Sequence, residues 1–476
     1  MYFGREIIAW CVFVITLVTS AAFDIGSSLA IETERPNIIY ILADDMGWTD
    51  LGCMGSRYYE SPHIDRLAAE GLTFSNYTVC QNCAPTRAAL MSGQYAPRTG
   101  VYTVQSLARG KASNRKMEVP ENVTRLPLEK ILVAETLQKA GYVTGMFGKW
   151  HLGHNTPEYH PAQRGFDEAI VCGRGHFKYA TFPEFDVPEG QYLTDFLADR
   201  AVEFIERHQQ EPFFLYLPHN AVHTPIHAKE ELLAKYKKKP PVGGHDDPAY
   251  AGMIESLDDC VGRVMEKLDE LGIAENTVLI FSSDNGGLGG YQVPETDLTK
   301  GITDNAPLRE GKGSLYEGGV RVPMIVRWPK VIEAGGRCDE ALVHVDMYPT
   351  FAALAGAKLA EGYTLDGVSM TRLFEEPGAS LGERAIFAHF PGYLQSYIKE
   401  AVWRTTPVAT IREGNWKLLE FFEDGRLELY NLAEDLSERN NLVEQESKLA
   451  QKLHKKMLAW REHTGAAMPK LKVGSE

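Results

Sequence analysis

Runs of consecutive apolar residues recur through the first three quarters of the chain. Residues 37–42, 212–217 and 277–281 are apolar at nearly every position. A strand covered by helices on both faces shows this pattern, so these runs predict buried strands of a parallel sheet. Residues 142–147 and 322–328 are expected to be two further strands.

Segments with apolar residues at helical spacing alternate with these runs, and several of them end at glycine. Strands that alternate with helices indicate an α/β fold, here a large and mostly parallel sheet flanked by helices. Asp258 and Asp259 lie on the longest expected helix, where we expect a solvated face. The expected helices cover residues 62–71, 128–140, 193–208, 248–272 and 346–356.

The pattern changes after about residue 380. Four short strands with turn residues between them are expected at 385–390, 408–412, 416–421 and 427–430, before a closing helix at 444–462. Short strands joined by tight turns are typical of antiparallel sheets. We therefore expect a main domain over residues 31–380 and a smaller antiparallel subdomain with a closing helix over residues 381–476.

The N-terminus resembles a secretory signal peptide. Arg5 precedes an apolar run over residues 7–18, and small residues follow as far as Ala30. The run is too short for a spanning helix, so residues 1–30 are predicted to be a signal peptide cleaved after Ala22 or Ala30. An uncleaved anchor is the alternative. We expect an exported protein without a membrane segment after cleavage.

Charge and cysteine content narrow the possible partners. The 476-residue chain has a formal net charge of −15, which argues against a nucleic-acid partner because phosphate backbones are bound through surplus cations. An anionic ligand would therefore need a local cluster of Lys and Arg. Six of the seven cysteines lie beyond residue 30 and show neither metal-type spacing nor a dense disulfide framework.

Polar residues follow directly where the predicted strands end. In open α/β sheets, ligands bind outside the carboxyl ends of the strands, so we expect these side chains to meet at one rim. If the chain stays extended after residue 147, Lys149 and His151 project to the same side. The residues concerned are Asp44 and Asp45, Lys149 and His151, His219 and His223, and Asp284 and Asn285.

Two of these pairs predict a metal site. Asp44, Asp45, Asp284 and Asn285 offer only hard oxygen ligands, which favour Ca²⁺ or Mg²⁺ over zinc or copper. Two well-separated pairs make a loose cage, whereas Mg²⁺ demands near-ideal octahedral geometry. Ca²⁺ is therefore the preferred ion.

The segment from Cys83 to Gly93 predicts a short helix with a chemically distinctive start. Pro85 suits a first helical turn, and Gly93 is a suitable stop. Cys83 would lie just ahead of the helix N-terminus, beside Arg87, where we expect the pKa of a thiol to be lowered. This arrangement indicates a reactive group or an anion site. The alternative is a buried structural cysteine.

Cys83-Ala-Pro-Thr-Arg resembles the signature of type I, formylglycine-dependent sulfatases, the arylsulfatase family of the alkaline phosphatase superfamily. Thr86 stands where that family commonly has Ser, which would leave maturation possible. The resemblance runs from Arg35 to about Arg327. It also rests on Arg-Pro-Asn-Ile-Ile-Tyr-Ile-Leu-Ala-Asp-Asp, Gly-Lys-Trp-His-Leu-Gly, His223-Thr-Pro, Ser283-Asp-Asn-Gly-Gly and Gly311-Lys-Gly.

This resemblance implies a mechanism and roles for individual residues. A maturation enzyme would convert Cys83 to formylglycine, whose hydrated gem-diol attacks sulfur and forms a covalent sulfo-enzyme. The substrate would be a sulfated carbohydrate or an aryl sulfate, met in the periplasm, outside the cell or in a lysosome. The resemblance implies that Arg87 and Lys149 hold the formylglycine and that Lys149, His223 and Lys312 bind the sulfate. It implies that His151 assists proton transfer. It also implies that Ca²⁺ is bound by the oxygen at position 83 together with Asp44, Asp45, Asp284 and Asn285.

Two other functions remain open at this point. One is a phosphonate monoester or phosphodiester hydrolase of the same superfamily, and the other is a sulfated-glycan-binding protein with an unconverted Cys83. Six residues on segments that could rim the pocket are expected to be ordinary surface residues: Arg174, His176, Lys178, His389, Tyr393 and Arg404.

Overall fold

The computed structural model describes residues 35–153, 155–292, 299–395 and 402–472. The predicted signal peptide, residues 1–30, lies outside this part of the chain. Within the described residues, no helix is long and apolar enough to cross a membrane.

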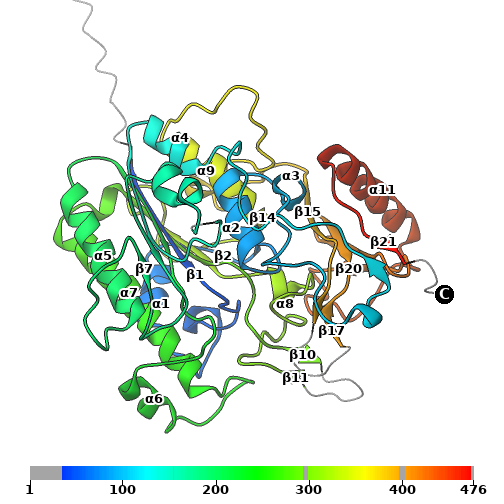
Figure 1. Cartoon of the computed structure of the whole chain (residues 1–476), viewed down its shortest axis with the longest axis horizontal. Coiled ribbons are helices and arrows are strands. Elements are labelled where there is room, and N and C mark those ends of the chain that lie inside the picture. Colours follow the sequence, from blue (N-terminus) through cyan, green and yellow to red (C-terminus); the bar gives the residue numbers. More distant parts are fainter. Residues whose placement is uncertain (1–34, 154, 293–298, 396–401, 473–476) are drawn as a thin grey trace, which may run out of the picture. The chain divides into compact units, whose positions relative to one another are not determined.

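A nine-stranded sheet forms the centre of the chain (Figure 1). Its five middle strands, in the order β9-β1-β8-β5-β6, are all parallel, whereas β12 and β7 pair antiparallel with their neighbours. The predicted mostly parallel sheet is thereby confirmed. In spatial order the strands are β13 (Gly336–Cys338), β2 (Leu72–Phe74), β12 (Met324–Arg327), β9 (Thr277–Ser283), β1 (Asn37–Ala43), β8 (Phe213–Pro218), β5 (Val143–Gly148), β6 (Glu168–Cys172) and β7 (Thr181–Phe182).

Helices cover both faces of this sheet, which is why its strands are apolar throughout. Successive side chains of a strand point to opposite faces. Ile39 and Ile41 accordingly belong to one hydrophobic core, and Ile38 and Tyr40 to the other. The first core includes residues of α1 (Pro62–Ala69), α5 (Leu193–His208) and α7 (Pro248–Glu270), and the second includes residues of α2 (Cys83–Ser92), α4 (Val133–Lys139) and α9 (Met347–Leu354).

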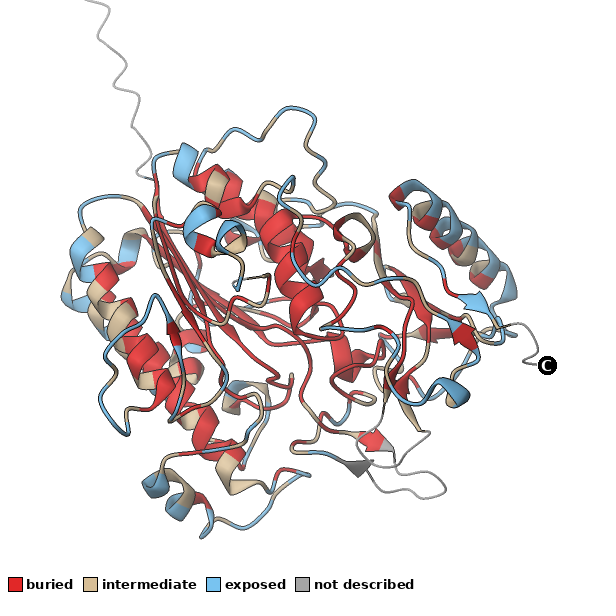
Figure 2. Ribbon diagram, viewed as in Figure 1, coloured by how far each residue is buried: buried red, intermediate tan, exposed pale blue. Residues whose placement is uncertain are grey.

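The smaller C-terminal sheet is antiparallel, as predicted, and lies beside the closing helix (Figure 1). Buried residues continue from the main sheet into this sheet, whereas the outer side of the closing helix is exposed (Figure 2). The sheet contains β15 (Ala385–Phe390), β18 (Val408–Glu413), β19 (Trp416–Phe421) and β20 (Leu427–Asn431), and the helix is α11 (Ser447–Thr464).

Two predictions about helices were wrong in detail. The helix expected at 128–140 begins only at Val133, because the Glu135 carboxylate accepts a hydrogen bond from the Leu132 amide at 2.6 Å and fixes the start there. Asp258 does not lie on a solvated face. It is buried and accepts hydrogen bonds from the backbone amides of His63 and Ile64, in the first turn of α1, whereas Asp259 is exposed.

The described residues also form shorter helices and strands. They are β3 (Tyr77–Thr78), α3 (Ala96–Thr99), β4 (Met117–Glu118), α6 (Glu230–Tyr236), β10 (Tyr291–Gln292), β11 (Thr299–Lys300), α8 (Glu317–Val320), β14 (Leu342–Val343), α10 (Arg372–Glu375), β16 (Leu394–Gln395), β17 (Trp403–Thr405) and β21 (Lys470–Leu471).

Candidate active site

Two adjacent strands bring the predicted metal-binding pairs together. Ala43 at the end of β1 pairs in register with Ser283 at the end of β9, so the residues that follow them lie side by side. The Asn285 side-chain amide donates to Asp45 Oδ1 at 2.9 Å, and the Asp45 amide donates to Asp284 Oδ1 at 3.2 Å. The rim predicted from the strand ends therefore exists.

Cys83 faces this rim from the first residue of α2. All ten residues of α2 are buried, and Gly93, with φ of 67°, ends the helix as expected. The Cys83 Sγ atom lies 3.6 Å from Lys312 Nζ and 4.0 Å from Asp45 Oδ1. Potential ligand atoms of Asp44, Asp45, Cys83 and His223, one from each, all lie within 4.8 Å of one another.

Each of the three carboxylates at this rim is paired with a different cation. Arg87 donates to Asp284 Oδ2 through Nε at 3.0 Å and through Nη2 at 2.7 Å. Lys149 Nζ donates to Asp44 Oδ2, and Lys312 Nζ donates to Asp45 Oδ2 at 2.7 Å. Three buried negative charges are thereby matched by three positive charges.

The loop that carries Lys312 is held from two sides. The Tyr291 hydroxyl donates to the Lys312 carbonyl at 2.7 Å, and the Gly313 amide donates to the Gln81 carbonyl at 2.7 Å, two residues before Cys83. From the C-terminal part of the chain, Arg404 Nη1 donates to the same Lys312 carbonyl at 3.2 Å.

A buried charge network continues this support into the C-terminal sheet. Lys417 Nζ, on β19, lies 2.8 Å from Glu317 Oε1 and 2.9 Å from Glu438 Oε1. The Glu317 amide also donates to Glu438 Oε2 at 2.6 Å. Since Glu317 begins α8, five residues after Lys312, the C-terminal sheet contributes to the position of this lysine.

Burial and pairing move the pKa values of the carboxylates in opposite directions. Burial opposes the ionisation of Asp44, but the Lys149 ammonium group and other nearby cations hold the pKa of Asp44 well below its usual range. Burial raises the pKa of Asp284 to about 7, with a further contribution from Asp44, and Arg87 opposes the increase. Neighbouring carboxylates with different pKa values are common at functional sites.

The expectation of a lowered thiol pKa at Cys83 was wrong. Burial raises the pKa of the Cys83 thiol to about 12, and Lys149 and Lys312 offset the increase only in part. The Arg87 guanidinium binds Asp284 and also donates to the Lys149 carbonyl at 2.7 Å, and its charge does not outweigh the effect of burial on the thiol. The unmodified side chain is therefore a neutral thiol near neutral pH.

The histidines of the rim lie in different environments. The chain does not stay extended beyond β5, because Gly148 and His151 have positive φ values of 131° and 64°. Burial, with Lys149 and Arg87 nearby, holds the pKa of His151 well below its usual range. His219 is fully buried against Cys260, whereas His223 Nε2 lies 3.7 Å from Asp45 Oδ2.

Unpaired acceptors at the rim fit a hard cation. Within the described part of the chain, Asp44 Oδ1 and Asn285 Oδ1 are buried and have no hydrogen-bond partner. Buried polar atoms usually have a partner, and these two oxygens beside the Asp45 carboxylate are suited to bind a metal ion. All three donors are oxygens, which suits Ca²⁺ or Mg²⁺.

Three residues that support the loops of the predicted metal site escaped sequence reasoning. Asp45 has a left-handed φ of 67°, and its carbonyl accepts a hydrogen bond from the Tyr250 hydroxyl at 3.2 Å. The same hydroxyl donates to Asp50 Oδ2 at 2.6 Å, and Asn305 hydrogen-bonds both the amide and the carbonyl of Gly287. These contacts join distant segments, so no local pattern could have indicated them.

Most of the six pocket-rim candidates are not surface residues. Arg174 and Lys178 are exposed as expected, whereas the other four are buried because each contacts the protein interior. His176 Nε2 lies 3.0 Å from the His223 carbonyl, His389 Nε2 lies 2.8 Å from the Ala467 carbonyl, the Tyr393 hydroxyl donates to Glu423 at 2.6 Å, and Arg404 contacts Lys312 as described above.

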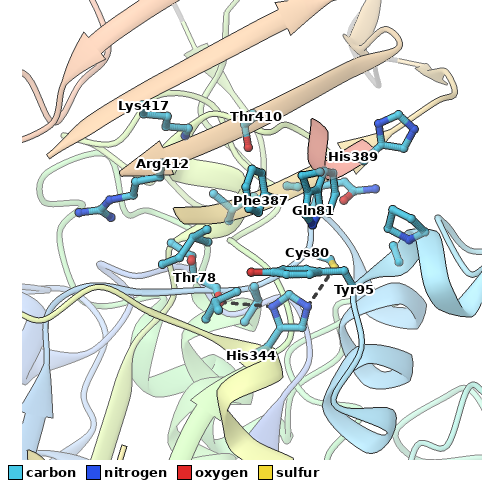
Figure 3. Close-up of a pocket in the computed structure, with 18 of the residues that line it drawn as sticks. Thr78, Cys80, Gln81, Tyr95, His344, Phe387, His389, Thr410, Arg412 and Lys417 are labelled. Atoms are coloured by element: carbon cyan, nitrogen blue, oxygen red, sulfur yellow. Dashed lines mark hydrogen bonds between the residues drawn. The ribbon is translucent and has the colours of Figure 1, made fainter. Parts of the chain in front are cut away.

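A separate small cavity lies where the loop before α2 meets the C-terminal sheet (Figure 3). Its volume is about 40 Å³, and Cys80, His344, His389 and Lys417 are among the residues that line it. Cys80 Sγ lies 3.3 Å from His344 Nε2, the contact dashed in Figure 3. None of the predicted catalytic or metal-binding residues lines this cavity, so it is distinct from the candidate active site.

Comparison with known families identifies the chain. A family model described as Sulfatase matches residues 36–357. The chain belongs to the sulfatase family. A second model, described as N-sulphoglucosamine sulphohydrolase, C-terminal, matches residues 311–463. The sulfatase resemblance noted from the motifs is thereby confirmed, and the protein is a sulfuric ester hydrolase.

Individual relatives support this assignment over most of the chain. A sulfatase of Formosa agariphila is 36% identical over 90% of this chain and 89% of its own length. The N-acetylgalactosamine-6-sulfatase of Homo sapiens is 34% identical over 76% of this chain and 73% of its own length. The crystal structure of Ps i-CgsB in complex with k-i-k-neocarrahexaose is 33% identical, with a TM-score of 0.76, and covers 90% of this chain and 93% of its own.

Proposed function

We propose that this sulfatase is exported and hydrolyses sulfate esters of carbohydrates with a nucleophile derived from Cys83. The observation that carries the proposal is the position of Cys83 Sγ, 3.6 Å from Lys312 Nζ and 4.0 Å from Asp45 Oδ1. The raised pKa of the thiol would make an unmodified Cys83 a poor nucleophile, which supports a nucleophile made by modifying this residue.

Conversion of Cys83 to formylglycine would supply a hydrated aldehyde whose hydroxyl attacks sulfur and which later releases sulfate by re-forming the aldehyde. Lys149 and Lys312 would bind the sulfate oxygens and stabilise the charge that develops as the S–O bond breaks. His223, beside Asp45, would bind a further sulfate oxygen. Arg87 would orient the site through Asp284 and the Lys149 carbonyl.

Proton transfer is assigned to His151. The low pKa of its imidazole leaves it neutral near pH 7, so it can accept a proton from the nucleophile. Within the chain as described, its buried Nδ1 has no hydrogen-bond partner, and we assign the role of acceptor to this atom. The departing sugar oxygen also needs a proton, which a histidine of the site would supply.

The proposed metal ion is Ca²⁺, held by Asp44, Asp45, Asp284, Asn285 and the oxygen at position 83. A bound divalent cation would acidify the attacking hydroxyl and offset the charge of the carboxylates. The unpaired oxygens of Asp44 and Asn285 support this set of ligands. Mg²⁺ is the second choice because the donors come from two separate loops.

A sulfated carbohydrate is the proposed substrate class. The relatives include an N-acetylgalactosamine-6-sulfatase and a protein crystallised with k-i-k-neocarrahexaose, so both names point to sugars. The predicted signal peptide supports action outside the cytoplasm, on material of the cell exterior or of a lysosome.

The proposal is tested by producing the chain together with a formylglycine-generating enzyme. Mass spectrometry of the Cys83 peptide should show loss of the thiol and gain of an aldehyde or its hydrate. The purified protein should release sulfate from sulfated saccharides and from an aryl sulfate, and Cys83→Ala should abolish release while the protein stays folded. An active Cys83→Ala variant, or faster hydrolysis of an aryl phosphonate than of the aryl sulfate, would contradict the proposal.

A further inference from the structure

The exposed side chain of Arg174 lies next to the His223 turn, at the edge of the candidate active site. Arg174 comes two residues after β6, and its Nε and Nη2 donate to the carbonyl and the hydroxyl of Thr224, both at 3.3 Å. His223 Nδ1 lies 2.6 Å from the same Thr224 carbonyl. One carbonyl oxygen therefore joins Arg174 to a histidine whose ring lies among Asp44, Asp45 and Cys83.

The backbone on either side of Arg174 is fixed to the same turn. The Asn220 side-chain amide donates to the Gly173 carbonyl at 3.1 Å, and His176 Nε2 lies 3.0 Å from the His223 carbonyl. Asn220 and His176 are both buried. These contacts hold the backbone around Arg174 against the His223 turn, although the side chain of Arg174 is exposed to solvent.

Arg174 differs from the other cations of the site in having no acidic partner. Arg87, Lys149 and Lys312 are each paired with a carboxylate at the rim. Among the residues that the structure describes, no carboxylate forms an ion pair with Arg174, and Thr224 is its hydrogen-bond partner. A guanidinium has five N–H donors, so three remain for a ligand.

We propose that Arg174 forms a second anion subsite, which binds a carboxylate or a second sulfate on the saccharide that carries the reacting sulfate. The inference rests on the proposed function, because His223 defines where the reacting sulfate is bound. The planar guanidinium suits an oxyanion with two oxygens available. An exposed and unpaired cation in a chain of net charge −15 also favours a partner of opposite charge.

The test compares substrates that differ by one charge. Three saccharides share the reacting sulfated sugar: the first has no other anion, the second has a neighbouring uronate carboxylate, and the third has a second sulfate. For each one, kcat/KM is measured with the wild type, Arg174→Gln and Arg174→Lys. The quantity compared is the ratio of kcat/KM for each doubly anionic saccharide to that for the singly anionic one.

The wild type should prefer at least one doubly anionic saccharide. Arg174→Gln should lower that ratio about tenfold, because it removes a charge-assisted hydrogen bond that an exposed guanidinium would make to the second anion. Arg174→Lys should give an intermediate ratio, because it keeps the charge without the planar fork. The saccharide whose ratio falls identifies the bound group as a carboxylate or a sulfate.

Arg337→Gln is the matched control, because Arg337 is an exposed arginine on β13 at the edge of the main sheet, paired with Asp339. Its ratios should equal those of the wild type. Unchanged ratios in Arg174→Gln would overturn the inference while leaving the sulfatase proposal intact. A mature wild type that releases sulfate from none of the three saccharides, nor from an aryl sulfate, would instead overturn the proposed function.

Discussion

Replacing Arg87 should disturb the charge balance of the site more than any other single cation change. Its guanidinium is fully buried, donates twice to Asp284 and donates once to the Lys149 carbonyl. Arg87→Met keeps most of the apolar volume but removes all three hydrogen bonds. At a pH above its pKa, Asp284, which is also fully buried, would then carry a negative charge without its main partner.

The structure sets the size of the effect. Removing one partner of a buried ion pair costs about 3–5 kcal/mol, because the other charge is left uncompensated. A chain of this length has an unfolding entropy of roughly 1 kcal/mol/K near its Tm, so about 4 kcal/mol lowers the Tm by about 4 °C. The loss should be smaller at pH 6 than at pH 8. With its pKa already at about 7 and Arg87 absent, Asp284 becomes protonated and loses its charge.

Thermal unfolding in the presence of a chelator measures this effect without a contribution from metal binding. Arg87→Met, Asp284→Asn and the double variant form a cycle, with the exposed Arg372→Met on α10 as the control. The double variant should be more stable than Arg87→Met alone, because it no longer buries an unpaired charge. A Tm of Arg87→Met within 1 °C of the wild type, or strictly additive losses in the double variant, would refute the reasoning.

Three further predictions follow from the same contacts. Ca²⁺ at about 100 times its Kd should stabilise the protein by about 2.7 kcal/mol, and Asn285→Ala should reduce this stabilisation. Thermal unfolding with Ca²⁺ and with a chelator measures it, and a wild-type Tm that is the same in both would exclude a Ca²⁺ site. Lys417→Met removes the cation paired with Glu438 and leaves Glu317 paired with Arg321 beneath the Lys312 loop, so KM should rise severalfold in steady-state assays, whereas an unchanged KM would remove the C-terminal sheet from substrate binding. Burial raises the pKa of Glu438 to about 7, so the native state binds the carboxyl proton more tightly than the unfolded state does. The resulting stabilisation is complete below about pH 4.5 and is lost by about pH 7, and Glu438→Gln should flatten this fall of Tm with rising pH.

The main sheet could be predicted from sequence because its signal is local. A strand buried on both faces must be apolar at every position, so β1 and β9 end within two residues of where their apolar runs end. The polar residues that follow must then lie at one edge of the sheet, since the two strands are parallel and adjacent. The proximity of Asp44 and Asp284 could therefore be predicted from their places directly after two buried strands.

The pairing of charges could not be predicted, because it depends on contacts between distant segments. Arg87 and Asp284 are 197 positions apart, and nothing in the local pattern distinguishes Asp284 from Cys83 as the partner of Arg87. The same limit explains the error over the Cys83 pKa. A sequence shows the positive neighbour but not the burial, and here burial dominates.

The charge pattern of the site accounts for the binding of an anion by a strongly acidic protein. Asp44, Asp45 and Asp284 are matched by Lys149, Lys312 and Arg87, so these six groups together carry no net charge. A divalent cation bound to the same carboxylates would leave an excess of two positive charges in a buried, low-dielectric site, where charges interact strongly. A sulfate ester carries one negative charge and would reduce this excess, whereas a doubly charged phosphate monoester would cancel it and be held more tightly. If these carboxylates hold the metal, the released sulfate, which carries two negative charges, would be bound more strongly than the singly charged ester, so this charge pattern predicts inhibition by inorganic sulfate.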